Sequence, residues 1–264
     1  MVAKHRHTWN QGVYERYIHE GRGCGNGPGY TPWIRVQDFA SRGTISRVKG
    51  RKSGRVHHLM SNNELAYFYI LDWSDNVLDI REQYPLMTVE SVMRIAERAG
   101  VRYPRDNVSG YPYVMTCDFL VTTTNGLKAR TVKMTSELSN ARVLEKLEIE
   151  RRYWAGRGID WKIVTENEIP YHKARNIEWL YATQYFDSVT GIPGYAAGAL
   201  DMIKTWYEES GLSILEIAQA AEGEFMLKSG VGLSLFKQLV LNKTIHMDLD
   251  GKIDLSKGRT IPIK

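Results

Sequence analysis

Cysteine is scarce in this chain of 264 residues. Only Cys24 and Cys117 occur, and neither has His or Cys neighbours at metal-ligand spacing. This scarcity excludes a disulfide-stapled scaffold and a cysteine-based zinc site. We therefore expect two free thiols in a reducing compartment.

Long apolar runs are also missing. No segment approaches the roughly 20 apolar residues that cross a bilayer, and the first residues lead into polar sequence rather than the apolar core of a signal peptide. Hydrophobic residues make up 43% and charged residues 25%, which is the balance of a folded globular protein rather than a disordered one. We expect a cytoplasmic protein without a membrane partner.

Positive charge is concentrated at one end of the chain. Residues 1–60 hold 11 Lys and Arg against 3 Asp and Glu, residues 61–170 hold 14 against 16, and residues 171–264 hold 10 against 11. A segment this basic can neutralise phosphates and is a candidate nucleic-acid contact. A solvated cationic surface would have the same composition.

The length suits two modest domains of roughly 100–150 residues better than one large one. Residues 1–55 precede them and are rich in Gly and Arg, with weak periodicity. For these we predict a basic, mostly irregular arm that becomes ordered on a partner.

Residues 56–170 alternate between strand and helix patterns, which predicts an α/β domain. Ser61 to Glu64 has the form of a capping box, so a helix should begin there. Further helices are expected at 89–99 and 141–154, and strands at 77–81, 113–121, 127–134 and 161–164.

Residues 171–264 have helical patterns at about 176–185, 196–210, 213–221 and 227–241, followed by short apolar segments at 245–249 and 252–255. Helices that close on a tight hairpin predict a small winged-helix domain. Ser213 is the expected N-cap of its short second helix.

The most informative segment is the predicted hairpin, because Asp118 lies inside an otherwise apolar strand. On the next strand Thr131 and Lys133 share one face, since strand side chains alternate. Asp followed by x-Lys is the core of the restriction-endonuclease hairpin. A simple cross-strand ion pair would give the same pattern.

A second carboxylate is available from Glu64 in the first turn of the preceding helix. The alternative is that Glu64 only caps that helix. His57 and His58 are further candidates for ligands or phosphate contacts, but adjacent residues of a strand point to opposite faces and cannot easily chelate one ion.

These residue types suit metal-assisted hydrolysis of a phosphodiester. Mg²⁺ prefers oxygen ligands and keeps several waters, so one or two carboxylates and a substrate phosphate can hold it. A nearby ammonium can position the attacking water or stabilise the developing charge. We expect Mg²⁺ as the cofactor, with Mn²⁺ able to substitute.

With these residues in place, the chain resembles the TnsA family, the endonuclease subunits of heteromeric bacterial transposases. Six ordered blocks carry the resemblance between residues 20 and 180: Glu20–Gly23 with Tyr30–Trp33, Gly54–Leu59, Val77–Leu86, Thr116–Val121, Leu144–Trp154 and Asn176–Leu180. The resemblance implies a restriction-endonuclease-like N-terminal domain and a winged-helix C-terminal domain.

The same resemblance assigns the catalytic Glu to Glu64, the Asp to Asp118 and the Lys to Lys133, and it places a further acidic position at Glu150. The family has Gln two residues before the Lys, whereas this chain has Thr131. A Thr hydroxyl is a shorter and weaker ligand, so we expect the Val132 carbonyl or water to take that place.

In function, the resemblance implies cleavage of the 5′ ends of a transposon. The partners would be double-stranded DNA at the transposon ends, a TnsB-like transposase that cuts and joins the 3′ ends, and a TnsC-like ATPase bound chiefly by the C-terminal domain. The near-neutral charge of residues 171–264 favours a protein-docking role for that domain.

Two other hypotheses remain open from the sequence. One is a free-standing restriction or repair endonuclease that acts without partners. The other is a catalytically dead winged-helix regulator, which should bind DNA through residues 227–241, although Lys228 and Lys237 are the only basic residues there.

Overall fold

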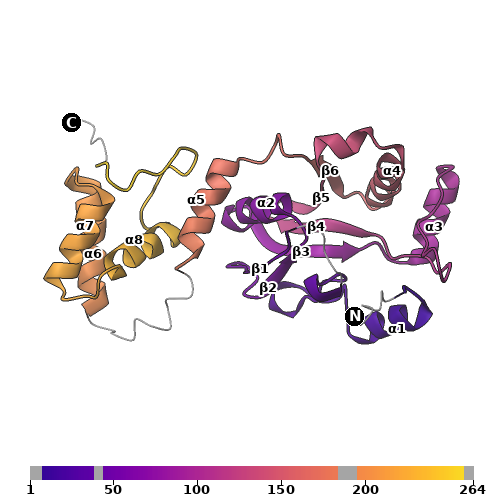
Figure 1. Cartoon of the computed structure of the whole chain (residues 1–264), viewed down its shortest axis with the longest axis horizontal. Coiled ribbons are helices and arrows are strands. Elements are labelled where there is room, and N and C mark those ends of the chain that lie inside the picture. Colours follow the sequence, from indigo (N-terminus) through magenta and orange to yellow (C-terminus); the bar gives the residue numbers. More distant parts are fainter. Residues whose placement is uncertain (1–7, 39–43, 184–194, 259–264) are drawn as a thin grey trace, which may run out of the picture. The chain divides into compact units, whose positions relative to one another are not determined.

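The computed structural model describes residues 8–38, 44–183 and 195–258 (Figure 1). The chain divides into two compact units, Met1–Ile169 and Pro170–Lys264. We refer to them as unit 1 and unit 2.

Unit 1 is built on a four-stranded sheet with the strand order β3-β4-β5-β6. Its strands are β3 (Val77–Pro85), β4 (Thr116–Thr123), β5 (Gly126–Val132) and β6 (Asp160–Val164). The first three run antiparallel, and β6 pairs parallel to β5. This mixed sheet with helices around it confirms the predicted α/β class, and the strand at 77–81 extends four residues further than its pattern indicated.

Three helices accompany this sheet: α2 (Asn62–Trp73), α3 (Val89–Arg98) and α4 (Ala141–Ala155). α2 packs on β3, α4 packs on β6, and α3 packs on α4. The helix predicted to begin at Ser61 does so, because the Ser61 hydroxyl accepts a hydrogen bond from the Glu64 backbone N–H at 3.1 Å. That cap fixes where the first turn of α2 presents its side chains.

β4 is buried over most of its length, since Cys117, Phe119, Leu120 and Val121 are at most 2% exposed. The Phe119 ring meets Tyr67 of α2 at a centroid distance of 5.8 Å. Cys117 and Leu120 belong instead to the main hydrophobic cluster, together with Trp154 of α4. A carboxylate within such a strand is removed from bulk water and needs a partner.

The described residues before 56 pack within unit 1, whereas their composition predicted a separate arm. α1 (Gln11–His19) begins after Asn10, whose side chain accepts a hydrogen bond from a backbone N–H of the first turn. Tyr17 and Trp33 are only 8% and 2% exposed and belong to the main core of unit 1. These residues are therefore part of the domain itself.

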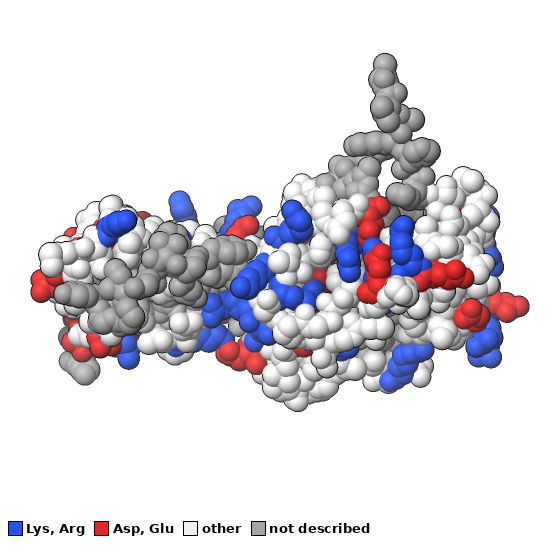
Figure 2. Space-filling view, turned by 90° about the horizontal axis from the view of Figure 1, so that it is seen from below, with Lys and Arg blue, Asp and Glu red and all other residues white. Residues whose placement is uncertain are grey.

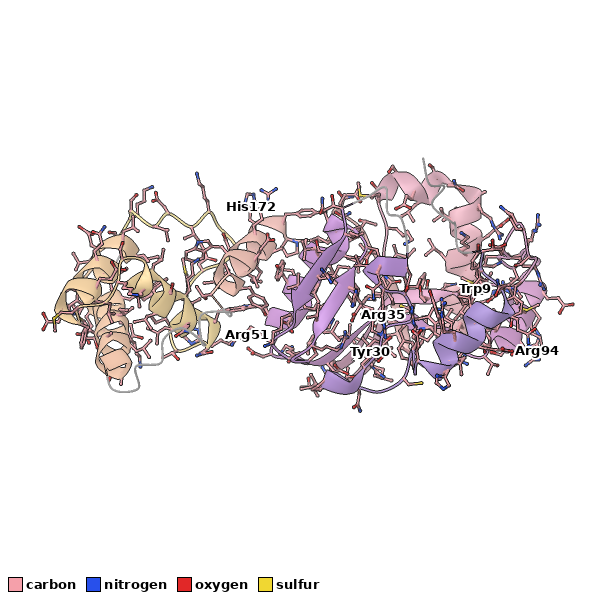
Figure 3. The ribbon with its side chains drawn as sticks, turned by 60° about the horizontal axis from the view of Figure 1, so that its bottom comes forward. Trp9, Tyr30, Arg35, Arg51, Arg94 and His172 are labelled. Carbon is pink, nitrogen blue, oxygen red and sulfur yellow. The ribbon has the colours of Figure 1, made fainter. Side chains whose placement is uncertain are left out.

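Gly23 in this segment allows a close approach between two parts of the chain. Gly23 has a φ of +78°, and a Cβ there would lie 2.3 Å from the Pro85 ring at the end of β3. Tyr30, labelled in Figure 3, donates its hydroxyl hydrogen to the Glu82 carbonyl of the same strand at 3.0 Å. Composition alone cannot distinguish glycines that allow a close approach from glycines of a flexible linker.

A two-stranded ribbon, β1 (Ser46–Lys49) and β2 (Val56–Leu59), is fastened to β3 by a buried polar network. Arg55 donates hydrogen bonds to both carboxylate oxygens of Glu82. His57 Nδ1 lies 2.7 Å from Glu82 Oε2, and its Nε2 lies 2.7 Å from the Ser53 hydroxyl. We call Ser53, Arg55, His57 and Glu82 the β3 network.

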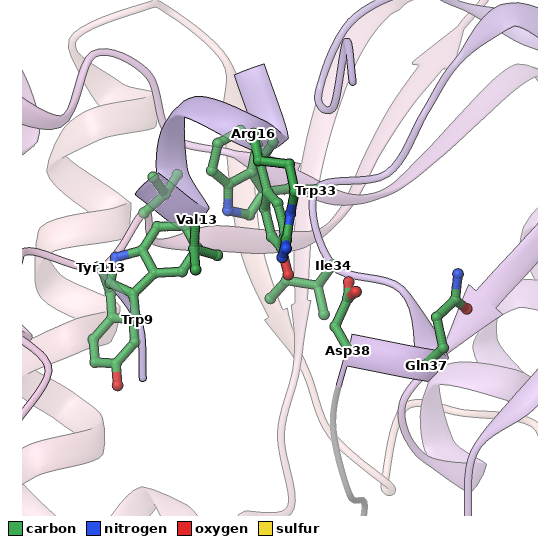
Figure 4. Close-up of a pocket in the computed structure, with 10 residues that line it drawn as sticks. Trp9, Val13, Arg16, Trp33, Ile34, Gln37, Asp38 and Tyr113 are labelled. Atoms are coloured by element: carbon green, nitrogen blue, oxygen red, sulfur yellow. The ribbon is translucent and has the colours of Figure 1, made fainter. Parts of the chain in front are cut away.

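An aromatic pocket of about 260 Å³ lies between α1 and the residues around Trp33 (Figure 4). Trp9, Trp33 and Tyr113 supply much of its wall, with Arg16 and Asp38 at its polar side. None of the predicted site residues lines it, so this pocket is separate from the candidate active site. On the face drawn in Figure 2, acidic and basic side chains lie beside one another.

Unit 2 is helical in its described residues: α5 (Tyr171–Tyr181), α6 (Tyr195–Glu209), α7 (Ile214–Glu224) and α8 (Val231–Leu241). α8 packs on the other three, and Ile203, Ile217 and Phe236 are fully buried between them. The predicted N-cap is confirmed, since the Ser213 hydroxyl accepts from the Glu216 N–H at 3.2 Å and the Glu216 carboxylate accepts from the Ser213 N–H at 2.8 Å.

The hairpin predicted at 245–249 and 252–255 is not formed, and neither segment contains a strand. A side chain of α5 forms hydrogen bonds with two backbone carbonyl groups of this loop. The Asn176 side chain donates to the carbonyl oxygens of Leu249 at 2.8 Å and Gly251 at 2.7 Å. These contacts hold the loop against α5.

The same loop returns to the start of α7 instead. The Leu215 N–H donates to the Leu255 carbonyl at 3.1 Å, and an isolated antiparallel bridge joins Ser213 to Gly258. The helices of the predicted winged-helix domain are therefore present, whereas its hairpin is absent from the part of unit 2 that the structure describes.

Candidate active site

The carboxylate inside β4 meets the lysine that follows β5. Lys133 Nζ lies 3.5 Å from Asp118 Oδ2 and 2.8 Å from the Val132 carbonyl oxygen. Asp118 Oδ2 also accepts a hydrogen bond from the Val132 backbone N–H at 2.7 Å. The charge of Asp118 raises the pKa of Lys133, so the ammonium is retained at neutral pH.

Glu64 reaches the same end of the sheet from the first turn of α2. Its Oε2 accepts a hydrogen bond from the Met60 N–H at 3.0 Å, and its Oε1 accepts one from the Ser61 hydroxyl at 3.1 Å. The capping interpretation is thus correct for Ser61, while the carboxylate binds the Met60 N–H in place of the Ser61 N–H of a capping box.

The side chain of Glu64 is buried, and burial raises its pKa to about 7, with the negative charge of Asp118 as the next cause. The negative charge of Asp118 beside the buried Glu64 carboxylate also favours a cation at this place. The capping role and the approach to Asp118 are therefore compatible in one residue.

Glu150 lies on α4 behind Asp118 and is 3% exposed. Its Oε1 accepts hydrogen bonds from the Thr131 hydroxyl and from Trp161 Nε1, the latter at 3.0 Å. Burial raises the pKa of Glu150 to about 7. Thr131 thus directs its hydroxyl to Glu150 rather than to Asp118.

Glu64 and Asp118 are the two carboxylates considered for the candidate site, since Glu150 accepts hydrogen bonds from Thr131 and Trp161. Within the described ranges, no group of three or more His, Cys, Asp or Glu side chains is placed to hold a metal ion. Glu64 and Asp118 offer hard oxygen ligands of the kind that Mg²⁺ prefers when it keeps several waters. The Val132 carbonyl, a predicted further ligand, accepts a hydrogen bond from Lys133 in this structure.

Comparison with known proteins identifies the family. The family description "TnsA-like endonuclease N terminal" matches residues 74–166, and "TnsA endonuclease C terminal" matches residues 168–249. The Escherichia coli protein "Transposon Tn7 transposition protein TnsA" is 36% identical over 251 residues, which cover 94% of this chain and 90% of the relative. The chain belongs to the TnsA endonuclease family.

As a TnsA-family member the chain is a DNA endonuclease, and so a phosphodiester hydrolase. Membership over nearly the full length favours this function over that of a catalytically dead regulator. No helix among the described residues is long and apolar enough to cross a membrane.

One residue near the site was missed from the sequence. Gln83 of β3 is 4% exposed, and its side-chain Nε2 donates to Glu64 Oε2 at 3.3 Å. Its Oε1 accepts a hydrogen bond from the Thr116 hydroxyl at 3.2 Å. In the ladder it stands opposite Asp118, between the pairs Glu82–Phe119 and Tyr84–Cys117.

The adjacent histidines have separate structural partners in this TnsA-family chain. His57 belongs to the buried β3 network, whereas His58 Nδ1 accepts a hydrogen bond from the Val36 N–H at 3.2 Å. The pair does not converge on one point, as the alternation of strand side chains predicts.

Proposed function

We propose that this chain cuts the 5′ ends of a transposon during cut-and-paste transposition, with a site built on Glu64, Asp118 and Lys133. The observation that carries the proposal is the approach of these three side chains at one end of the sheet. Lys133 Nζ lies 3.5 Å from Asp118, and the Asp118 charge contributes to the raised pKa of Glu64.

The proposal includes the finer fold assignment. A hairpin that carries Asp118 and Lys133 beside a helix that carries Glu64 supports a restriction-endonuclease-like unit 1. The three helices α6 to α8, with a following loop that returns to Ser213, support a winged-helix-like unit 2 whose wing is unpaired.

Mg²⁺ is the proposed cofactor, with Mn²⁺ as a substitute. Glu64 and Asp118 would hold it, and the Val132 carbonyl and Glu150 are further candidates. When bound, the ion lowers the pKa of a ligated water and shields phosphoryl charge.

The chain's own residues have separate tasks in this reaction. A water oxygen attacks phosphorus, one P–O ester bond breaks, and the proton lost by the water balances the proton gained by the leaving sugar oxygen. The Lys133 ammonium, which has mobile donors beside Asp118, would orient that water or bind a non-bridging phosphate oxygen. Asp118 is kept in place by the Val132 N–H.

The partners in this proposal are transposon-end DNA, a TnsB-like transposase and a TnsC-like ATPase. The name of the Escherichia coli relative supports a role in transposition. Unit 2 supports docking to protein rather than reading DNA, since Lys237 donates to the Trp179 carbonyl at 3.0 Å and lies 4.0 Å from the centre of its ring. Lys228 is then the remaining cation of residues 227–241.

The test combines the chain and its neighbouring transposase with an end-labelled transposon-end duplex, in Mg²⁺ or EDTA, on strand-resolved denaturing gels. Asp118→Ala should abolish 5′-strand cuts and retain the melting temperature within a few degrees. Glu64→Gln keeps the side-chain shape and much of the capping capacity, and it should also lose the cuts. Near-normal cleavage by either variant contradicts the site, and cuts by the chain alone would favour the free-standing nuclease.

Lys133→Ala separates metal binding from catalysis. An ammonium gives no lone pair to Mg²⁺, so its removal should retain or slightly strengthen metal affinity, measured by calorimetry, while 5′-strand cleavage is lost. The partner's 3′-strand cuts should persist and leave branched, singly joined products. A Lys133→Ala chain that still yields fully excised element would make the lysine structural.

A further inference from the structure

Four cations line one hollow on unit 1, which has a volume of about 290 Å³. The hollow lies where the loop after α3 meets the first turns of α4. None of its lining residues is acidic: they are Arg102, Tyr103, Pro104, Arg105, Asn107, Tyr113, Arg142 and Lys146. We call this hollow the basic groove.

Two of the four charges are available to a ligand. In the described part of the chain, the Arg102 guanidinium and the Lys146 ammonium make no hydrogen bond or ion pair, and both side chains are exposed. Arg105 donates to the Gly110 carbonyl at 3.1 Å, and Arg142 pairs with Glu145 across one helical turn. Uncompensated cations with exposed donors attract anions such as phosphates.

The loop that carries Arg102 and Arg105 is ordered by its own contacts. Asp106 accepts hydrogen bonds from the Val108 and Ser109 N–H groups, each at 2.9 Å, and from the Tyr113 hydroxyl at 2.8 Å. Because the loop is already fixed, less conformational entropy is lost when a ligand binds there.

The basic groove lies close to the candidate active site along α4. Lys146 and Arg142 precede Glu150 by one and two turns, which is about 6 and 12 Å at 1.5 Å per residue. On the other wall, Tyr113 comes five residues before Asp118. One DNA strand advances about 3.4 Å per nucleotide, so 12 Å corresponds to roughly four nucleotides.

We propose that the basic groove binds the sugar-phosphate backbone of DNA within about four nucleotides of the cut, with Arg102 and Lys146 as the phosphate contacts. The inference rests on the endonuclease function proposed above. The basic groove would bind the DNA backbone, whereas the site of Glu64, Asp118 and Lys133 would cut it.

The experiment measures binding of the full-length chain to a short fluorescent DNA duplex in EDTA over a series of salt concentrations. The double variant Arg102→Ala/Lys146→Ala should bind at least tenfold more weakly. The slope of log affinity against log salt should fall by about 1.8, because each lost phosphate contact contributes about 0.9. At saturating DNA, 5′-strand cleavage with the partner should remain, since no catalytic group is changed.

The matched control is Lys128→Ala/Lys162→Ala, which removes the same charge from the neighbouring strands β5 and β6. Neither lysine lines the basic groove. The slope of log affinity against log salt for this control variant should equal that of the wild type. Equal slopes and affinities for the two double variants would overturn the proposal, as would a wild-type chain that binds the duplex without salt dependence.

Two further variants keep the outcome interpretable. Arg102→Gln/Lys146→Gln preserves side-chain length and should reproduce the loss, which excludes an effect of truncation. Asp118→Ala should bind with the wild-type slope but not cut. If it cuts, the proposed function fails while the groove result still stands on binding alone.

Discussion

Gln83 has a backbone conformation that differs from that of the other residues of its strand. It lies inside β3 with a φ of +48°, a left-handed conformation that non-glycine residues seldom adopt. The twist directs its amide between the Glu64 carboxylate and the Thr116 hydroxyl. Strained backbone of this kind is often kept where a functional group must be oriented.

We expect Gln83→Leu to reduce 5′-strand cleavage roughly tenfold or more, because a hydrogen bond to a charged group contributes about 1.5–3 kcal/mol. Weaker Mn²⁺ binding in calorimetry should accompany the loss, since the Glu64 carboxylate is no longer held. Thr116→Val, which removes only the outer hydrogen bond of Gln83, is the milder control. Unchanged metal affinity and cleavage in Gln83→Leu would make the residue purely structural.

Of the residues near the candidate site, Asp118 could be predicted from the sequence, whereas Gln83 could not. A charge inside an apolar strand with Lys133 on the next strand is visible as a pattern, and the structure brings these two side chains to 3.5 Å. Gln83 has no such signal. Its role depends on a positive φ and on α2 packing over β3, and neither follows from local spacing.

At the level of elements, the β3 network holds the β1–β2 ribbon on the sheet. Burial alone would raise the pKa of Glu82, but the electrostatic effect of His57 and the hydrogen bonds from Arg55 outweigh it and lower the pKa to about 2. Glu82 of this network also directly precedes Gln83 in the sequence. A change in the network should therefore affect both folding and the site.

The stability supplied by Glu82 should depend on pH in a defined direction. Its pKa is about 2 in the folded chain, against 4.5 for an unperturbed glutamate, so the contribution is complete above pH 4.5 and is lost as the pH falls toward 2. Glu82→Gln leaves Arg55 buried without its carboxylate and should cost about 3–5 kcal/mol at neutral pH. Urea unfolding from pH 7 to 2 should show the two proteins converging in acid, and a constant gap would contradict the assignment.

Elements with their own capping or turn signals are predictable from the sequence, whereas those defined by tertiary partners are not. α7 begins at Ser213 because its capping box is local in sequence. The helix α1 was missed, although Trp9, Val13 and Tyr17 recur every four residues, because the neighbouring glycines suggested an irregular arm. The segment predicted as a wing contacts Asn176 instead of forming a hairpin, and this partner is far away in the sequence.

For the molecule as a whole, the division at residues 169 and 170 separates two hydrophobic cores. The four helices of unit 2 bury Ile203, Ile217 and Phe236 among themselves. A core closed within one unit can fold without the other. The charges of the two units also differ, since the excess of basic residues lies in the first 60 residues.

Residues 170–264 expressed alone should therefore unfold cooperatively on heating, as followed by circular dichroism. They should bind the ATPase partner more tightly than DNA, because Lys237 is engaged by Trp179 and the segment is close to neutral. The full chain should show two transitions in urea. A fragment without a cooperative transition, or one with strong, salt-sensitive DNA binding, would reverse this view.

The β3 network also satisfies the distance criteria by which hydrolytic triads are recognised. Ser53, His57 and Glu82 stand in the order hydroxyl, imidazole, carboxylate, with both contacts at 2.7 Å. Yet these residues are 2%, 0% and 0% exposed, and Arg55 already occupies the carboxylate. A geometric search for serine hydrolases would return this nuclease, and an active-site-directed fluorophosphonate should leave Ser53 unmodified, because the reagent's phosphorus cannot reach a hydroxyl that is buried inside the fold.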